Sequence, residues 1–406
     1  MPTATPGAVL LTGATGFVGM ETLARYAQQT RRDVFALVRA NSDAEAQERL
    51  DATLALVGVP AGDCDGRVTA VAADIEREGL GLEPERRADL AGRVSEIVHS
   101  AASVSFSLPL EDSRRINVGG TRQMLDFAES AREHGGLERF AYVSTAYVAG
   151  THAGEFREDQ LDVGQDFRNA YEQSKFEAEQ LVRQQTARLP IQVFRPSIIV
   201  GERESGWTAA FNVLYSPLKA FVRGALPFLP ADRRAPVDVV PVDYVADAIF
   251  TLTRTPVADS GETFHLVSGP RATTVGGLSQ RAAAYLERKP PRIVPPRLYR
   301  RLLHPLLTRT GSDRRRRGLA RAEVFFPYFT MRVRFDDRRA RQRLVPHGIE
   351  APPVEQYLDK LMDFARRADW AGSACRARRP LGPGPASRSS SRTRRGHSGA
   401  PRRRAR

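Results

Sequence analysis

The stretch that decides the fold is Val9 to Gly19, which reads VLLTGATGFVG. Its first four residues predict a buried strand, and the glycines that follow predict a tight turn that opens a helix. Glycine permits such a turn and lets backbone N–H groups approach a pyrophosphate at the helix N-terminus. A glycine triplet alone is a weak signal. Because this one closes the first strand of a strand–helix–strand unit, it predicts a dinucleotide-binding site.

Short apolar runs alternate with helical stretches as far as residue 200. The expected strands are Ala8–Thr12, Asp33–Val38, Arg67–Ala72, Glu96–Ser100, Arg139–Ser144 and Ile191–Arg195. The expected helices lie near residues 18–29, 42–57, 84–92, 109–134 and 168–188. Near-continuous apolar strands are buried on both faces, as in a parallel sheet. The pattern therefore predicts an α/β fold, a doubly wound parallel sheet of the Rossmann type.

The composition changes after Gly201. Residues 207–230 are apolar and interrupted by prolines, whereas residues 271–370 form a basic, largely helical stretch. We expect a nucleotide-binding domain over residues 1–200 and a smaller C-terminal substrate lobe over residues 201–370. Residues 235–270 are expected to return to the larger domain. The apolar segment suits an alkyl chain, which gains about 0.8 kcal/mol per buried CH₂, but ordinary core packing explains it equally well.

The overall composition is that of an ordinary soluble protein, 41% hydrophobic and 27% charged. The first seven residues lack the basic region of a signal peptide, and no run of eighteen apolar residues occurs. The two cysteines, Cys64 and Cys375, cannot build a disulfide framework. These features predict a cytoplasmic protein.

The net charge of +14 is concentrated at the C-terminus. Residues 376–406 hold eleven arginines and no acidic residue. This stretch, rich in proline, glycine and serine, is expected to form a disordered tail over residues 371–406. A polybasic arm for nucleic acid or anionic lipid is one interpretation. Because arginine is abundant throughout the chain, a weakly selected extension is the simpler one, and a nucleic-acid partner is not expected.

The residues that follow the second and third strands bear on the choice of nucleotide. The second strand ends in Arg39. An acidic residue there suits the ribose 2′-hydroxyl of NAD, whereas an arginine suits the 2′-phosphate of NADP. Asp74 and Ile75 close the third strand and could flank the adenine, although Asp74 could equally cap the strand end. The cofactor predicted from Arg39 is NADPH (NADP⁺).

A tyrosine and a lysine four residues apart mark the candidate catalytic helix. Tyr171 and Lys175 stand in the sequence YEQSK, and the chain has only four lysines. On a helix the two side chains share a face, where an ammonium group would favour the tyrosinate and lower the pKa of the phenol. Taken alone, a tyrosine stem packed on a lysine stem explains the pair better. Thr145, at the carboxyl end of the fifth strand, favours the catalytic interpretation, and Ser144 is out of phase.

Several motifs together resemble the extended short-chain dehydrogenase/reductases. The nearest branch contains the fatty acyl-CoA reductases (male-sterility type) and the thioester-reductase domains of carboxylic acid reductases. Over residues 8–270 the matching motifs are Gly13-x-x-Gly16-x-x-Gly19, HSAASVSF (99–106), NVGGT (117–121), VSTAY (143–147), RPSII (195–199) with Gly206-Trp207, and DVVPVDYV (238–245).

The resemblance implies a role for individual residues. Tyr171 would be the general acid, Thr145 would donate a hydrogen bond to the substrate carbonyl oxygen, and Lys175 would hold the nicotinamide ribose and tune Tyr171. Asn117 would lie on a kinked helix nearby, or simply be an interior helix residue. The implied cofactor contacts are Gly13, Thr15, Gly16, Phe17, Val18, Gly19, Arg39, Asp74, Ile75, Ala101, Ala102, Lys175 and Pro196.

Three hypotheses follow for the function. The first is an NADPH-dependent reductase of acyl thioesters, acting on acyl-CoA or an acyl carrier protein and giving aldehyde or alcohol. The second is an epimerase, dehydratase or hydroxysteroid-like dehydrogenase of the same fold. The third is a scaffold bound to a membrane surface or to nucleic acid through the tail and the basic segment Leu298–Leu307, although surface packing is the default interpretation of that segment. The seven histidines show no ligand spacing, so no metal is expected. His99 is expected to be a packing residue or to lie near the cofactor, and Cys64 is expected to be inert.

Overall fold

The computed structural model describes residues 7–211, 213–224, 228–256, 260–299, 301, 305 and 326–370. The arginine-rich tail and most of the basic segment Leu298–Leu307 lie outside these residues, so the predictions made for them stay predictions. Within the described residues, every helix is too short or too polar to traverse a lipid bilayer.

Seven parallel strands form the central sheet. In spatial order they are β12 (Glu262–Leu266), β7 (Ile191–Pro196), β5 (Arg139–Val143), β4 (Val94–His99), β1 (Ala8–Thr12), β2 (Val34–Val38) and β3 (Val68–Ala72). The chain runs outward from β1 to β3 and then crosses back to β4. The strand order therefore reverses between β1 and β4, which is where open α/β sheets bind ligands. The predicted Rossmann-type fold is confirmed.

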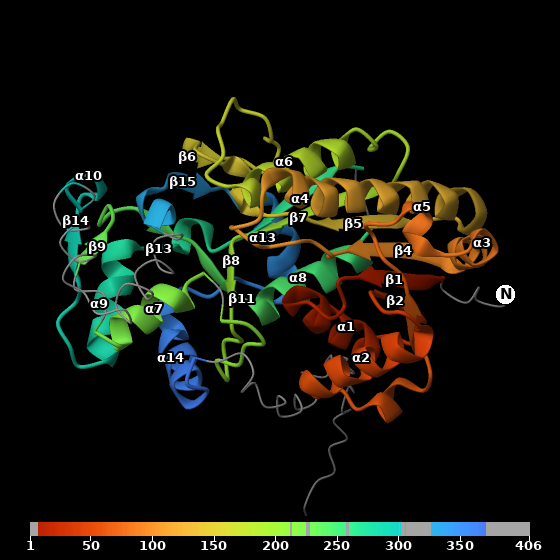
Figure 1. The fold of residues 1–406 in the computed structure, drawn as a ribbon, viewed down its shortest axis with the longest axis horizontal. Coiled ribbons are helices and arrows are strands. Elements are labelled where there is room, and N and C mark those ends of the chain that lie inside the picture. The colour runs from red at the N-terminus through yellow and green to blue at the C-terminus, as the bar shows by residue number, and fades with distance from the viewer. Residues whose placement is uncertain are drawn as a thin grey trace, which may run out of the picture.

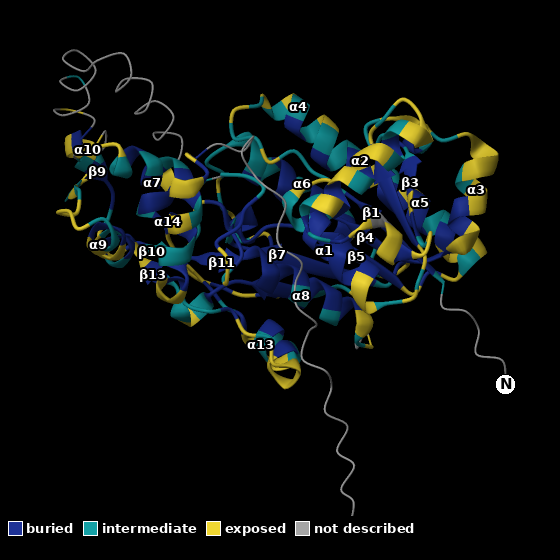
Figure 2. Cartoon of the chain, turned by 90° about the horizontal axis from the view of Figure 1, so that it is seen from below, coloured by how far each residue is buried: buried dark blue, intermediate teal, exposed yellow. Residues whose placement is uncertain are grey.

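Helices cover both faces of the sheet (Figure 1). One face carries α3 (Pro84–Arg93), α5 (Gly120–Gly135) and α6 (Ala170–Arg183), and the other carries α1 (Phe17–Gln29), α2 (Asp43–Leu56), α8 (Val242–Arg254) and α13 (Arg338–Leu344). Successive residues of β1 enter opposite cores: Leu10 packs in the first, whereas Val9 and Leu11 pack in the second. Figure 2 shows the strands buried between these layers. Burial on both faces explains the apolar runs of the sequence.

The expected helix over residues 109–134 is interrupted near its start. The structure has α4 (Leu110–Arg114), a π-helical turn η3 (Arg115–Gly119) and then α5. Single π-helical turns inserted in α-helices frequently occur at functional sites. Asn117 lies on this turn, on the kinked helix that was predicted for it.

The C-terminal lobe surrounds a separate core of short elements. Its helices are α7 (Tyr215–Val222), α9 (Val275–Tyr285), α10 (Pro296–Leu298) and α14 (Leu358–Arg367). Two-stranded sheets lie outside the central sheet. They pair β8 (Ile198–Val200) with β11 (Val239–Pro241), β9 (Phe228–Pro230) with β14 (Arg292–Val294), β10 (Pro236–Val237) with β13 (Thr273–Thr274), and β6 (Ala153–Phe156) with β15 (Arg332–Phe335). Short 3₁₀ turns complete the described chain: η1 (Ala61–Cys64), η2 (Glu78–Gly81), η4 (Ala146–Ala149), η5 (Gly269–Arg271), η7 (Phe326–Thr330), η8 (Val345–His347) and η9 (Val354–Gln356).

Candidate active site

Two glycines of the turn after β1, Gly13 and Gly19, are packed too tightly for a larger residue. Gly13 has φ +72°, and a Cβ on it would lie 2.7 Å from the backbone nitrogen of Ala101. A Cβ on Gly19 would lie 1.9 Å from the carbonyl oxygen of Gly13. Gly16 is the N-cap of α1, where no side chain caps the helix and the first turn has no acidic residue. The helix N-terminus thus presents its N–H groups to an anion, which suits the pyrophosphate of a dinucleotide.

A cavity of about 390 Å³ opens beside this turn. Of the residues predicted to contact a cofactor, eight line it: Gly13, Thr15, Gly16, Arg39, Asp74, Ile75, Ala101 and Ala102. The other five are not among the residues that line it: Phe17, Val18, Gly19, Lys175 and Pro196. Phe17, for example, faces Trp207, with ring centroids 6.2 Å apart. Asp74 accepts a hydrogen bond from the backbone nitrogen of Glu76 at 3.0 Å, so it closes a local turn while lining the cavity.

Two arginines stand at one end of the cavity. The Arg39 side chain is 74% exposed and lies 3.4 Å from the Glu76 carboxylate. Arg49, from α2, also lines the cavity and donates a hydrogen bond to the Arg39 carbonyl. The sequence pattern missed Arg49, since one more arginine on an amphipathic helix carries no signal in an arginine-rich chain.

Thr145 and Tyr171 meet at the carboxyl edge of the sheet. Thr145 caps the turn η4 that follows β5, and Tyr171 is the second residue of α6, after the cap residue Asn169. Burial raises the pKa of Tyr171 to about 12, while a hydrogen bond with the Thr145 side chain acts in the opposite direction. A phenol with this pKa is fully protonated near neutral pH. It can donate a hydrogen bond alongside the Thr145 hydroxyl and can transfer its proton.

Lys175 is hydrogen-bonded to strand β5. Its Nζ donates to the Tyr142 hydroxyl and to the Val143 carbonyl, each at 2.9 Å, and lies 4.4 Å from the centre of the Tyr142 ring. Burial lowers the pKa of Lys175 to about 7. The prediction that Lys175 lowers the pKa of Tyr171 is wrong in this structure, because desolvation of the phenol dominates and the ammonium is bound to strand β5.

Asn117 connects the loop after β4 to the catalytic helix. Its Oδ1 accepts from the Ser103 nitrogen at 2.8 Å, and its Nδ2 donates to the Ser103 carbonyl at 3.1 Å and to the Ser174 hydroxyl at 2.9 Å. Ser103 lines the cofactor cavity, while Ser174 precedes Lys175 on α6. Asn117 therefore fixes the position of α6 relative to the cavity.

Two side chains that could have been nucleophiles are otherwise engaged. The Ser144 hydroxyl donates to the buried Glu179 carboxylate at 2.6 Å, in agreement with its being out of phase for catalysis. Cys64 is buried, and burial raises the pKa of its thiol, which disfavours the reactive thiolate.

Aromatic side chains form a wall between Tyr171 and the lobe. The Phe106 ring lies 5.5 Å from Tyr171 and stacks on Tyr328 at 5.5 Å, and Tyr147 packs edge-on against Tyr328 at 5.3 Å. Tyr328 comes from η7, and its hydroxyl accepts a hydrogen bond from Asn169 at 2.8 Å. The sequence pattern missed Tyr328, because nothing local pairs it with a helix so distant in the chain.

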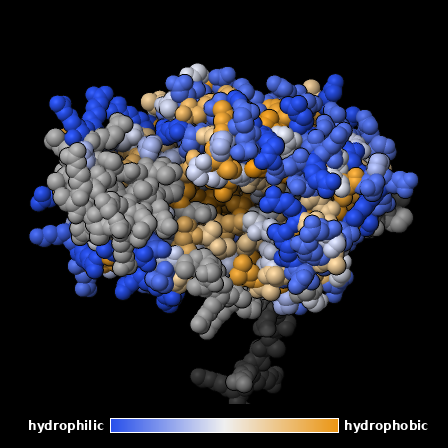
Figure 3. Space-filling view, viewed as in Figure 1, coloured by the Kyte–Doolittle hydropathy of each residue, from blue (hydrophilic) through white to orange (hydrophobic). Residues whose placement is uncertain are grey.

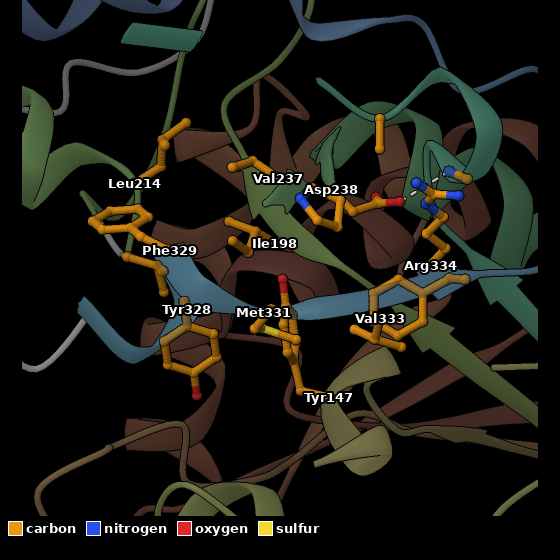
Figure 4. Close-up of a pocket in the computed structure, with 15 residues that line it drawn as sticks. Tyr147, Ile198, Leu214, Val237, Asp238, Tyr328, Phe329, Met331, Val333 and Arg334 are labelled. Atoms are coloured by element: carbon orange, nitrogen blue, oxygen red, sulfur yellow. Dashed lines mark hydrogen bonds between the residues drawn. The ribbon is translucent and has the colours of Figure 1, made fainter. Parts of the chain in front are cut away.

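Beyond this wall lie two small apolar cavities of about 30 and 40 Å³. Leu214, Val237 and Phe329 line both, and Figure 4 shows the Tyr147 hydroxyl pointing into the first. Figure 3 shows hydrophobic side chains gathered in a recess near the middle of the molecular face. Each cavity is about the size of a water molecule's share of liquid volume, so a long alkyl chain requires the lining side chains to move.

The apolar segment over residues 207–230 divides between two roles. Trp207 is buried beneath Phe17, as core packing predicts. Leu214, Leu218 and Phe221, in contrast, line the second cavity. One carboxylate, Asp238, lines the first cavity, where burial raises its pKa to about 6 while backbone N–H groups of Ser268 and Gly269 donate to it.

A glycine turn at the strand-order reversal, beside a helix with the Tyr-x-x-x-Lys pattern, defines an oxidoreductase of the extended short-chain dehydrogenase/reductase type that uses a nicotinamide cofactor. The family model of the male sterility protein matches residues 11–249. The chain therefore belongs to the male sterility protein family, and the resemblance seen in the motifs is confirmed.

Individual relatives agree with this assignment. The isonitrile lipopeptide synthase of Streptomyces coeruleorubidus is 37% identical over 256 residues, covering 61% of this chain and 17% of that protein. Fatty acyl-CoA reductase 1 of Xenopus laevis is 30% identical over 275 residues, covering 59% of this chain and 53% of that protein. The terminal R domain from the myxalamid PKS-NRPS biosynthetic pathway superposes with a TM-score of 0.79 at 27% identity, covering 91% of this chain and 93% of that one. The chain thus spans about a sixth and about half of the length of the two curated relatives.

Proposed function

We propose that this chain reduces acyl thioesters with NADPH. The observation that carries the proposal is the Thr145–Tyr171 pair, whose tyrosine contacts an aromatic wall backed by apolar cavities, in a chain that also has a nucleotide cradle. A thioester has a carbonyl for the donor pair and an acyl chain for the apolar side. The names of the relatives, a fatty acyl-CoA reductase and a lipopeptide synthase, support this substrate class.

The cofactor, when bound, supplies a hydride to the carbonyl carbon. The residues of this chain act on the oxygen, where negative charge develops as the carbonyl is reduced. Thr145 and Tyr171 donate hydrogen bonds to that oxygen, and Tyr171 transfers its proton. The resulting hemithioacetal collapses to an aldehyde and a free thiol. A second reduction at the same pair would give the alcohol.

The residues that would hold the cofactor are arranged along the cavity. The glycine turn would bind the pyrophosphate, Asp74 and Ile75 would flank the adenine, and Ala101 with Ala102 would form the opposite wall. Lys175 has two hydrogen bonds to described residues, so its remaining N–H group can bind the nicotinamide ribose hydroxyls. Phe17, Val18, Gly19 and Pro196 would support these contacts.

The preference for NADPH rests on Arg39 and Arg49. Both line one end of the cavity, and a guanidinium pair suits the 2′-phosphate through charge-assisted hydrogen bonds. Glu76 pairs with Arg39 and Arg115. Its carboxylate would repel the 2′-phosphate unless Arg39 turns away from Glu76 to bind the phosphate. The cavity lining holds a second carboxylate, Asp74, but Asp74 closes a local turn and Glu76 is also paired with Arg115, so the balance favours NADPH.

The substrate is proposed to arrive as a thioester of coenzyme A or of a carrier protein. The experiment that tests the proposal incubates the purified chain and NADPH with a long-chain acyl-CoA and, separately, with the same acyl group on a carrier protein. Loss of NADPH absorbance with release of thiol is the expected result, and the faster substrate identifies the carrier. If neither thioester is consumed while NADH supports turnover of a sugar nucleotide or sterol, the proposal is overturned in favour of the alternative chemistry.

A further inference from the structure

A buried chain of hydrogen bonds runs from Lys175 to the floor of the cofactor cavity. Lys175 Nζ donates to Tyr142 at 2.9 Å, and the Tyr142 phenol is hydrogen-bonded to the Thr121 side chain. Thr121 Oγ1 lies 3.2 Å from His99 Nε2, and His99 Nδ1 lies 2.8 Å from Thr12 Oγ1. Thr12 lines the cavity. All five side chains are buried and come from β1, β4, α5, β5 and α6.

The partners of Thr12 fix the protonation of His99. Thr12 Oγ1 accepts from the backbone nitrogens of Ser100 and Ala101, each at 3.1 Å, so both of its lone pairs are used. Its single proton must then be donated to His99 Nδ1. Burial lowers the pKa of His99 to about 3, so the ring is neutral and carries its own proton on Nε2. This tautomer follows from the hydrogen-bond partners and donates to Thr121.

The partners of Thr121 fix the direction of its own hydroxyl in the same way. Thr121 Oγ1 donates to the Asn117 carbonyl at 2.6 Å, so it accepts from His99 Nε2. Burial raises the pKa of Tyr142 well above its usual value, which keeps the phenol protonated. Lys175 Nζ donates to the Tyr142 oxygen at 2.9 Å, so the phenol is the side-chain acceptor that holds the ammonium. A buried network of this kind rigidifies the side chains that take part in it.

We infer that Tyr142 is the positioning residue of Lys175, and that the chain Tyr142–Thr121–His99–Thr12 fixes the lysine relative to the cofactor cradle. The inference rests on the role proposed for Lys175 in holding the nicotinamide ribose. Packing alone does not require this network, because Phe140 and Val193 fill the same face of the sheet with apolar side chains. The hydroxyl of Tyr142 adds an acceptor for the buried Lys175 ammonium, whose other hydrogen bond to a described residue is to the Val143 carbonyl.

The titratable side chains near Lys175 come from three elements. Glu179, one turn further along α6, favours the ammonium from a distance. Tyr171 lies on the same helix, Tyr142 is on β5, and the neutral His99 is on β4. Of these, Tyr142 is the side chain in hydrogen-bond contact with Nζ. Removal of the Tyr142 hydroxyl would disfavour the charged form of Lys175 and lower its pKa further.

The test uses the small number of lysines in the chain. Wild type and Tyr142→Phe are labelled with ¹³Cε-lysine, and the four lysine signals are followed by NMR as pH is varied. The Lys175 signal is identified by its loss in Lys175→Met. We expect the Lys175 midpoint in Tyr142→Phe to lie about half a unit to one unit lower than in wild type. Tyr26→Phe is the matched control, since Tyr26 is equally buried but bonds Glu96 and Thr253.

An unchanged midpoint in Tyr142→Phe, or an equal shift in Tyr26→Phe, overturns the inference. If Tyr142→Phe does not fold, Thr121→Val tests the next link, with a smaller shift expected in the same direction and no shift as the contrary result. The measurement needs no substrate. A chain that binds NADP⁺ but reduces no thioester would therefore remove the proposed function while leaving the Tyr142 result to stand by itself.

Kinetics provide the second readout. Tyr142→Phe should lower kcat about tenfold and change the KM for NADPH by less than about threefold. It should also shift the fall in rate at high pH to a lower pH, because the neutral amine forms earlier. A loss of thermal stability with kcat and the pH profile unchanged would mean that Tyr142 is only a structural residue.

Discussion

The Rossmann half and the C-terminal lobe differ in how far apart their contacting segments lie in the sequence. In the first, β1 pairs with β2 and β2 with β3, each joined by a single helix. The lobe, in contrast, is joined to distant segments: β15 pairs with β6, and Tyr328 bonds Asn169 across 159 residues. Local units carry their function in short motifs, so cofactor chemistry is readable from sequence. Substrate recognition is assembled from distant segments and is visible only once the chain is folded.

The largest expected effect comes from the proton donor, where the two halves meet. Tyr171→Phe should lower kcat by more than about a thousandfold, because it removes the general acid and leaves Thr145 as the remaining donor. Affinity for NADPH should stay within about threefold of wild type, measured by fluorescence titration. Turnover retained within about tenfold would show that Tyr171 is not the proton donor.

Lys175→Met tests the cofactor side of the same helix. Turnover should fall about a hundredfold, since the nicotinamide ribose loses its proposed partner. The thermal stability of the Lys175→Met variant should increase, although its turnover falls. The pKa of Lys175 is lowered from 10.5 to about 7, so the unfolded chain binds more protons between those values and wild-type stability rises with pH through that window.

Below a pH of about 7 the full cost of the buried ammonium is present. Lys175→Met removes that cost and should raise Tm by about a few degrees at pH 6 to 7. Scanning calorimetry at several pH values checks this. A lower Tm in the variant across the whole range would contradict the buried-ammonium account.

Arg39→Ala combined with Arg49→Ala confines the change to one end of the nucleotide cavity. Affinity for NADPH should fall by about a hundredfold, on the order of tenfold for each arginine lost. Affinity for NADH should change little, because NADH has no 2′-phosphate. Arg86→Ala, a surface arginine that pairs with Asp43, is the control. Equal loss for both nucleotides would mean that the arginines support the fold and do not select the cofactor.

The smallest expected effect on turnover is that of a substitution in the C-terminal lobe. Tyr328→Phe keeps the ring that stacks on Phe106 but removes the hydroxyl that accepts from Asn169. We expect kcat/KM for the thioester to fall about fivefold, with NADPH affinity unchanged. A change in NADPH affinity equal to the change for the thioester would remove the distinction between the two halves.

Local patterns predicted the sheet closely. The strand expected at Ala8–Thr12 has those bounds, and the one expected at Asp33–Val38 begins one residue later. The joint involvement of Thr145 and Tyr171 was expected from the family resemblance of their motifs, and the structure brings the two side chains together. The partner of Lys175 was not predictable, since burial and a tyrosine on β5 decide where the ammonium lies. Arg49 and Tyr328 reach the site through tertiary contacts that leave no periodic signal.

The central claim is that a thioester is the electrophile reduced at the Thr145–Tyr171 pair. The most direct test measures thiol released and NADPH consumed in the same reaction, with a long-chain acyl thioester. The account predicts that thiol appears only when NADPH is present, with one NADPH consumed per thiol if the product is an aldehyde and two if it is an alcohol. Thiol release at the same rate without NADPH would mean hydrolysis, and would contradict the account.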